Sequence, residues 1–160
     1  MKTNKTVFAL IVAGASIFSV WFWLEVMPYN QARQARFNID VLGRYLISSR
    51  IMTDRIVKSL AEVPEFEIVS TRESLALKSA AIRDGKEGPY RYHLENLGEF
   101  EFVISASPSG LFAPREEFGM TEQGILKYNT VNVDPFPDSR EEVNGWESIF
   151  GEAGLKTKSR

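Results

Sequence analysis

The chain has 160 residues, a formal charge of −2 and 25% charged residues, and its length allows one domain after an N-terminal anchor. It contains no cysteine, which excludes disulfides, cysteine metal ligands and a cysteine nucleophile. Its lysines and arginines are scattered rather than gathered in one patch, so nucleic acid is not an expected partner.

The first segment, residues 7–26, is a continuous apolar run whose one charged residue, Glu25, lies at its far end. About 20 such residues cross the hydrocarbon core of a bilayer. Lys2 and Lys5 precede the run, and Ala13-Gly14-Ala15 has the small-x-small form of a signal peptidase site. Because the apolar run continues well beyond that site, we expect a retained signal anchor rather than a cleaved signal peptide.

The expected topology divides the chain into four parts. Basic residues are nearly balanced on the two sides of the span, but the short N-terminal tail and its signal-like lysines favour an inside N-terminus. We therefore expect a single-pass protein of the bacterial inner membrane with its domain on the periplasmic side. The parts are a cytoplasmic tail (1–6), the anchor (7–26), an extracytoplasmic domain (27–133) and a C-terminal extension (134–160).

Aromatic residues and one acid mark the outer end of the span. Trp21, Trp23 and Tyr29 fit an aromatic belt at the membrane surface. Alternatively, the two tryptophans contact a partner helix, or a bound pigment or quinone. An acid in an apolar span is a functional candidate, although Glu25 lies near enough to the end to reach the headgroups. These four residues are the predicted membrane or partner contacts.

A long amphipathic helix is predicted over residues 30–63. Apolar residues recur there at a spacing of three and four, as at Ile39 and Leu42, and Pro64 would end the helix. Pro28 is predicted to kink the rod where it leaves the membrane, because proline removes a backbone donor and clashes with the preceding turn.

Short elements are predicted to follow. Residues 65–69 form a possible strand, and residues 72–82 are predicted to be a helix with Thr71 and Ser74 near its N-cap. Residues 83–89 are dense in turn formers.

Alternating apolar residues then predict an antiparallel meander. Residues 90–94 and 99–104 form a predicted hairpin, and 118–120 and 125–128 are two further short strands. A brief helix is expected within 139–150. Such a sheet must bury its apolar face, and the long helix is the available cover.

Several of these segments resemble type IV pilins and pseudopilins. Residues 27–36 resemble the proline-containing exit of a pilin helix and the polar stretch that follows it. Residues 118–125, an aromatic residue followed after five positions by Gly124 and Ile125, resemble a strand of pilin-like domains. The resemblance implies an α+β fold: a single transmembrane helix that continues into a long amphipathic helix packed on a small antiparallel meander.

One departure limits what this resemblance implies. Prepilins carry a glycine at the cleavage site, then an aromatic residue and, four positions beyond it, a glutamate that registers subunits. This chain has Gly14, but Ala15 and Ser19 stand at the corresponding positions. The fold is therefore carried over, and processing and filament assembly are not.

No residue pattern indicates catalysis or metal binding. His93 is the only histidine and lies on a predicted strand, where a surface position is expected. The acidic pairs Glu99 with Glu101 and Glu116 with Glu117 are expected to be solvated. We predict no catalytic, cofactor-binding or metal-binding residues, and no enzyme activity.

Three functions remain open. The first is a non-catalytic, membrane-anchored accessory subunit of a larger assembly, for example a photosynthetic or respiratory one, with integral membrane subunits and lipid as partners. The second is a divergent pseudopilin of a type II secretion or type IV pilus system. The third is an anchored enzyme or ligand-binding domain.

Overall fold

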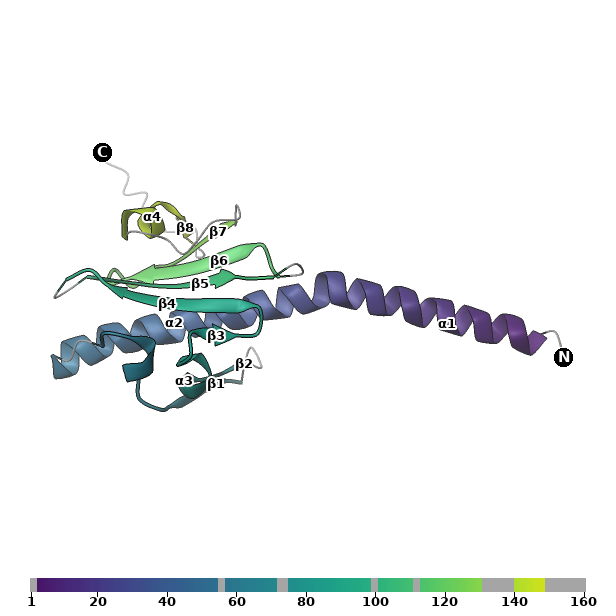
Figure 1. Cartoon of the computed structure of the whole chain (residues 1–160), viewed down its shortest axis with the longest axis horizontal. Helices are drawn as coiled ribbons and strands as arrows, with labels where there is room; N and C mark the ends of the chain where they lie inside the picture. The colour runs from purple at the N-terminus through teal and green to yellow at the C-terminus, as the bar shows by residue number, and fades with distance from the viewer. Residues whose placement is uncertain are drawn as a thin grey trace, which may run out of the picture.

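The computed structural model shows an α+β protein with one long N-terminal helix and two antiparallel sheets (Figure 1). The structure describes residues 3–54, 57–71, 75–98, 101–110, 113–130 and 140–148. The predicted α+β layout is therefore confirmed.

The long helix has two α-helical parts joined by a wide turn. Helix α1 (Thr3–Trp21) leads into a π-helical turn (Phe22–Val26), and α2 (Met27–Thr53) follows without a break. Pro28 lies in the first turn of α2, where its missing N–H and its ring are accommodated by the widened turn before it. Figure 1 shows the rod changing direction around the π-helical turn, and Pro28 follows that turn in the first turn of α2.

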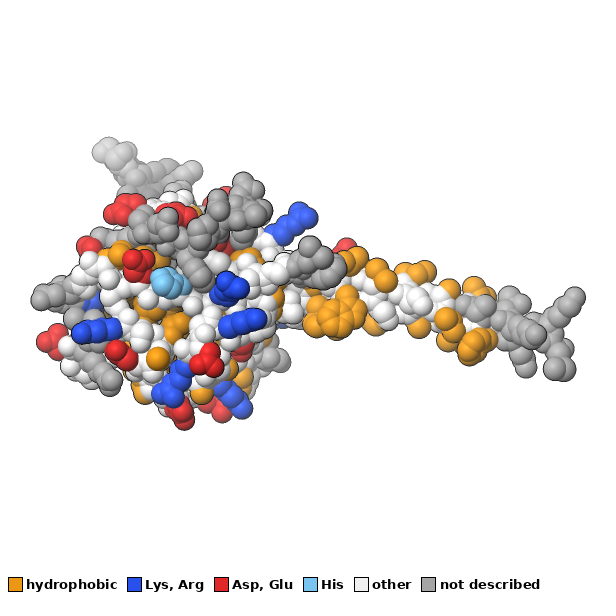
Figure 2. Space-filling view, viewed as in Figure 1, with side chains coloured by type: hydrophobic (Ala, Val, Ile, Leu, Met, Phe, Trp, Pro, Cys, Tyr) orange, Lys and Arg blue, Asp and Glu red, His pale blue; other side chains and the backbone are white. Residues whose placement is uncertain are grey.

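Helix α1 presents apolar side chains on all sides. Its central window has no buried residue, and among the described residues this is the one helix that is long and apolar enough to cross a membrane. In Figure 2 orange apolar side chains cover this arm, whereas blue and red charges gather on the domain. The predicted span is therefore present as an exposed apolar helix.

Helix α2 carries the core along one stripe. Ala35, Ile39 and Leu42 are at most 1% exposed, and their spacing of three and four residues places them on one face. The predicted amphipathic helix is confirmed over most of its length.

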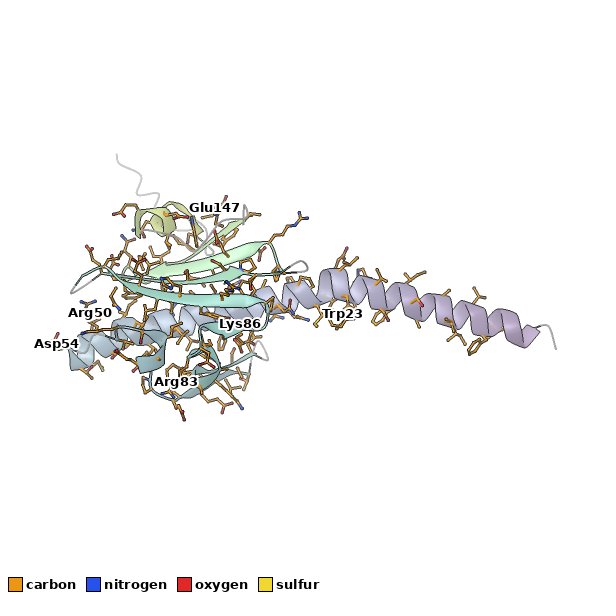
Figure 3. All side chains as sticks on the ribbon, in the orientation of Figure 1. Trp23, Arg50, Asp54, Arg83, Lys86 and Glu147 are labelled. Carbon is orange, nitrogen blue, oxygen red and sulfur yellow. The ribbon has the colours of Figure 1, made fainter. Side chains whose placement is uncertain are left out.

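The helix ends ten residues earlier than predicted. Asp54 adopts a left-handed conformation (φ 52°), and its N–H donates to the Arg50 carbonyl at 3.0 Å, which closes the helix. Figure 3 shows both residues at the far end of α2. After it, a 3₁₀ turn covers Leu60–Glu62. Leu60 in this turn and Val63 just after it are buried, and they keep the three-residue spacing that predicted a helix although they do not lie in one. The prediction of a helix to residue 63 is thus wrong, because a left-handed cap at an aspartate interrupts it.

The larger sheet is a six-stranded antiparallel meander. Its strands follow chain order, and the pairing of Tyr92 with Ala106 and of Leu94 with Ile104 places apolar residues on the α2 face. The predicted meander is confirmed, although Glu99 and Phe100 lie outside the described residues. The strands are β3 (Lys86–Glu87), β4 (Tyr90–Asn96), β5 (Phe102–Pro108), β6 (Glu116–Thr121), β7 (Leu126–Thr130) and β8 (Glu147–Ser148).

A second, two-stranded sheet lies on the other side of α2, so that α2 passes between the two sheets (Figure 1). It pairs β1 (Glu67–Ser70) with β2 (Leu75–Lys78), and α3 (Ser79–Ile82) follows. The helix predicted over residues 72–82 is wrong in its first part: pairing with β1 and burial of Leu77 override the helical preference of its leucines and alanines. The suggested capping residue Ser74 lies outside the described residues.

Helix α4 (Arg140–Gly145) covers the outer face of the larger sheet. Val143 and Trp146 form a small cluster with Val103 there. Gly119 permits this contact, since a Cβ atom at that position would lie 3.0 Å from both the Trp146 ring and Val143. The brief predicted helix is confirmed, and residue 134, the predicted start of the C-terminal extension, lies outside the described residues.

Candidate functional site

The four predicted contact residues lie around the junction of α1 and α2. The Trp21 indole Nε1 donates to the Glu25 carboxylate Oε2 at 2.8 Å, so the structure brings these two together. Trp23 is 62% exposed on another part of the helix surface (Figure 3). Tyr29 is separate again, with the Arg33 guanidinium carbon 5.9 Å from its ring centroid.

The Trp21–Glu25 bond satisfies a carboxylate that would otherwise stand alone in an apolar segment. An ionised group in a bilayer is costly unless it is paired or reaches the headgroups. The two residues border an open hollow of about 390 Å³ on the helix surface. Its remaining lining residues, all on α1 or the π-helical turn, are Ser16, Ile17, Val20 and Leu24.

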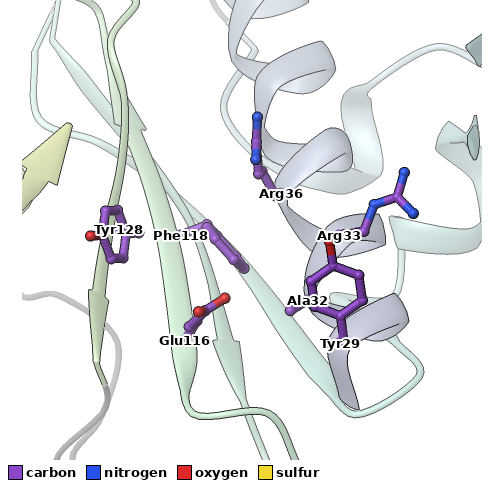
Figure 4. A pocket seen from close by; sticks show the side chains of 7 residues that line it. All are labelled: Tyr29, Ala32, Arg33, Arg36, Glu116, Phe118 and Tyr128. Carbon is purple, nitrogen blue, oxygen red and sulfur yellow. The ribbon is translucent and has the colours of Figure 1, made fainter. Parts of the chain in front are cut away.

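A second hollow opens where α2 leaves the span. We call it the membrane-proximal groove; it has a volume of about 380 Å³ and lies between α2 and strands β6 and β7 (Figure 4). In Figure 4, Glu116 extends from β6 toward Ala32, and Phe118 lies between the strand and the helix. The lining residues are Tyr29, Ala32, Arg33, Arg36, Glu116, Phe118 and Tyr128.

The two walls of this groove carry opposite charges. Helix α2 contributes Arg33 and Arg36, one turn apart, and β6 contributes Glu116. Phe118 is 3% exposed and forms an apolar floor. On the β7 side the Tyr128 hydroxyl donates to Glu147 at 2.6 Å, and this hydrogen bond with the carboxylate raises the pKa of Tyr128.

A buried polar cluster ties α2 to the sheets farther from the span. The fully buried Asn38 amide donates to the Glu87 carboxylate and to the Tyr92 hydroxyl oxygen, the latter at 2.9 Å. Gln34 Nε2 donates to the Asn38 side-chain oxygen at 2.8 Å and to the Ala76 carbonyl at 2.7 Å. Burial raises the pKa of Glu87 and the pKa of Tyr92. The cluster is closed by its own partners, so its evident role is to orient α2 between the sheets.

Glu117 forms a smaller polar cluster on the outer face of the sheet. Its carboxylate accepts hydrogen bonds from Asn129 at 3.1 Å and from Ser107 at 3.2 Å, and it is 6% exposed. Burial raises the pKa of this carboxyl above 4.5. The expectation that Glu117 is solvated is therefore wrong, whereas Glu116 beside it is exposed as expected.

His93 lies on the outer face of β4 opposite Ser105, with its side chain exposed as predicted (Figure 2). Glu101 is also exposed, while its predicted companion Glu99 lies outside the described residues. Within the part of the chain that the structure describes, no group of three His, Asp or Glu side chains is arranged to hold a metal ion.

No family model, curated protein or solved structure matches the chain.

Sequence reasoning found the junction residues but missed the groove. Trp21 and Glu25 are four residues apart, a spacing that places them on one helical face. Arg33 and Glu116 are remote in sequence and line one groove only because the meander packs along α2. The one feature of the sequence that pointed to the groove is a pair of arginines, one helical turn apart, directly after the span.

Proposed function

We propose that the protein is a non-catalytic, membrane-anchored accessory subunit of a larger membrane protein assembly. In this proposal α1 lies in the bacterial inner membrane, packed against helices of integral membrane subunits, and the domain stands on the periplasmic side. A photosynthetic or respiratory complex is one setting that fits.

One observation carries the proposal: a single continuous helix is exposed and apolar at one end and forms the domain core at the other. Ile17 in α1 is 71% exposed, whereas Ile39 in α2 is fully buried. From Thr3 to Thr53 the rod is roughly 75 Å long at 1.5 Å per residue. Such a rod holds the domain at a set distance from the membrane, which suits a subunit that positions or grips a neighbour.

The Trp21–Glu25 pair supports a protein partner in the membrane. Buried acids in spans usually face other helices or polar cavities rather than lipid. The hollow beside this pair offers space for a partner side chain, or for a pigment or quinone ring.

A second candidate, a divergent pseudopilin, is favoured by the layout of the domain. The long helix lies along an antiparallel meander, the arrangement expected for a pilin-like domain. The two candidates differ in the length of the mature chain, since processing of a pseudopilin after Gly14 would remove fourteen residues, whereas the accessory subunit keeps its full length.

Purification from native membranes in mild detergent tests both candidates. Intact mass would report any processing near Gly14, and protein identification would name stoichiometric companions. A full-length chain with integral membrane subunits is the expected result. A trimmed chain that travels with secretion or pilus components would replace the first proposal with the second, and a full-length chain alone would contradict both.

The side of the membrane can be tested separately because the chain lacks cysteine. Met52 is 84% exposed at the far end of α2, so Met52→Cys gives one accessible thiol. A membrane-impermeant maleimide should label this thiol in spheroplasts. Labelling only after lysis would place the domain in the cytoplasm.

A further inference from the structure

We infer that the apolar helix binds a second transmembrane helix that presents a lysine or arginine side chain to Glu25. This rests on the proposed placement of α1 in a membrane beside other helices, and it names the chemistry of the partner there. The surface involved is the open hollow on α1 and the π-helical turn. We call it the Glu25 face, and its residues are Ser16, Ile17, Val20, Trp21, Leu24 and Glu25.

The Glu25 carboxylate is held toward the interior of the span. Side chains of a helix lean toward its N-terminus, which from residue 25 is the direction of the membrane centre. The hydrogen bond from Trp21 Nε1 to Glu25 Oε2, at 2.8 Å, keeps the carboxylate over the preceding turn. A glutamate that reached for the headgroups would extend the other way, toward Tyr29. The carboxylate therefore lies among apolar side chains, where a charged group needs a partner.

Trp21 alone does not complete the hydrogen bonding of this carboxylate. An ionised carboxylate has two oxygens with about four acceptor positions, whereas an indole has a single N–H donor. Among the described residues, Trp21 is the one side chain that donates to Glu25, and no basic side chain pairs with it. Ser16, on the same face, donates its hydroxyl to the Val12 carbonyl at 2.9 Å instead. Charged groups within a bilayer pair with opposite charges, so a basic side chain is the partner that fits.

The shape of the Glu25 face fits a helix. It extends from Ser16 to Glu25, roughly 14 Å along one helix at 1.5 Å per residue. Ile17, Val20 and Leu24 recur on it at a spacing of three and four, the spacing at which side chains of one helix pack between those of another. Ile17 and Leu24 are 71% and 57% exposed, so this row is open to a neighbour. A single protein segment that enters the hydrocarbon core must be helical to satisfy its backbone, so a protein partner at this depth is a helix.

A peptide of defined sequence tests the chemistry of the partner. The full-length chain carries a donor fluorophore on Asn30→Cys, an exposed position just outside the span, and is reconstituted in phosphatidylcholine vesicles. The acceptor is attached to a polyleucine helix of about 20 residues, with lysine, glutamine or leucine one turn from the labelled end. We expect energy transfer to show the lysine peptide bound about tenfold more tightly than the leucine peptide, with the glutamine peptide between them.

Paired variants separate the charge from its position. Glu25→Gln should lower the affinity for the lysine peptide to that for the leucine peptide. Adding Val26→Glu to Glu25→Gln moves the carboxylate roughly a quarter of a turn around the helix, off the Glu25 face, and should restore nothing. Ile17→Trp fills the hollow and should weaken binding severalfold, whereas Ile11→Trp, exposed on α1 but outside the hollow, should bind as the unaltered chain does. Circular dichroism confirms that the domain of each variant is folded.

Four results would overturn the inference. Equal binding of the lysine and leucine peptides would show that the Glu25 face does not select a basic helix. Binding restored by Val26→Glu would show that any acid at this depth suffices. Loss of lysine-peptide binding in vesicles that contain phosphatidylethanolamine would assign Glu25 to a lipid amine. Stronger energy transfer between two copies of the chain than to the lysine peptide would make the face a self-association surface. No native companion takes part, so failure here is distinct from failure of the accessory-subunit proposal, which co-purification decides.

Discussion

Helices α1 and α2 belong to one continuous rod, yet their apolar side chains meet opposite surroundings. Leu10 is 69% exposed in α1, while Leu42 is 1% exposed in α2. The residue types are alike, so the difference lies in what covers them. The chain supplies its own cover for α2 through two sheets, and it supplies none for α1.

This contrast separates two kinds of stability in one molecule. Substitutions in the α2 stripe act on folding of the domain, because they alter a packed core. Substitutions in α1 act on membrane insertion and on whatever packs there, because no part of the described domain touches its central window.

The largest effect is expected from a charge placed in each half. Ile39→Asp puts a carboxylate where the side chain is fully buried, which costs several kcal/mol and should prevent folding of the domain. Ile17→Asp should leave the domain folded and weaken insertion, since an aspartate near the centre of a span costs about 2.5–3.5 kcal/mol. Limited proteolysis reports folding and membrane fractionation reports insertion. Unfolding of the domain by Ile17→Asp would show that the halves are not independent.

Removal of apolar volume should give a smaller contrast of the same kind. Leu42→Ala should lower the free energy of unfolding by about 2–5 kcal/mol, because it opens a cavity in the core. Leu24→Ala, at a site that is 57% exposed, should change it by less than about 0.5 kcal/mol. Urea unfolding followed by circular dichroism measures both. Equal losses would mean that Leu24 contributes to the domain core.

The left-handed cap at Asp54 offers a third test, in which the free energy of unfolding should change by about 1 kcal/mol. Asp54→Gly should stabilise the domain slightly, because glycine adopts a φ of 52° without steric cost. Asp54→Val should destabilise it by a similar amount or more, since a β-branched residue resists that conformation. Thermal melts compare the two variants. A stabilising valine would indicate that α2 extends past Thr53 in solution.

The smallest expected effect is the pH dependence of domain stability that comes from Glu87, in the buried polar cluster around Asn38 of α2. Burial raises the pKa of Glu87 above 4.5, so the folded state holds this proton more tightly than the unfolded state does. The contribution of protonated Glu87 to the stability of the folded domain is therefore fully present below pH 4.5, and it is lost as the pH rises through the pKa that Glu87 has in the folded state. Glu87→Gln should flatten this part of the stability profile and give a small gain at neutral pH. Thermal melts of both proteins from acidic to neutral pH measure this profile. A steeper fall in stability for Glu87→Gln than for the unaltered chain would contradict the prediction.

Much of the fold could be predicted because it depends on local periodicity. The alternation of Tyr90, Tyr92 and Leu94 marked one face of β4, and the stripe through Ile39 and Leu42 marked the buried face of α2. The end of α2 could not be predicted, because Leu60 and Val63 keep the helical spacing while they are buried in a turn. Strand β2 could not be predicted either. Its leucines and alanine are good helix formers, and it is a strand only because it pairs with β1.

The candidate site was predictable only where it lies within one helix. The Trp21–Glu25 hydrogen bond follows from a spacing of four residues. The groove needs residues of α2 and of β6 to line one hollow, which depends on how the meander packs along the helix. Burial of Glu117 beside exposed Glu116 likewise depends on the pleat of β6 and on its neighbours Ser107 and Asn129.

The central claim is that one continuous helix is uncovered along α1 and covered by the domain along α2. The most direct test is a scan of side-chain accessibility by spin labelling in bilayers. The absence of cysteine allows single labels at each position from Val7 to Met52. We predict uniformly high oxygen accessibility through α1 in protein without partners. Beyond Tyr29, accessibility should become periodic, with minima at Ala35, Ile39 and Leu42. A periodic pattern that continued through α1 would show that the domain covers it and would contradict the account.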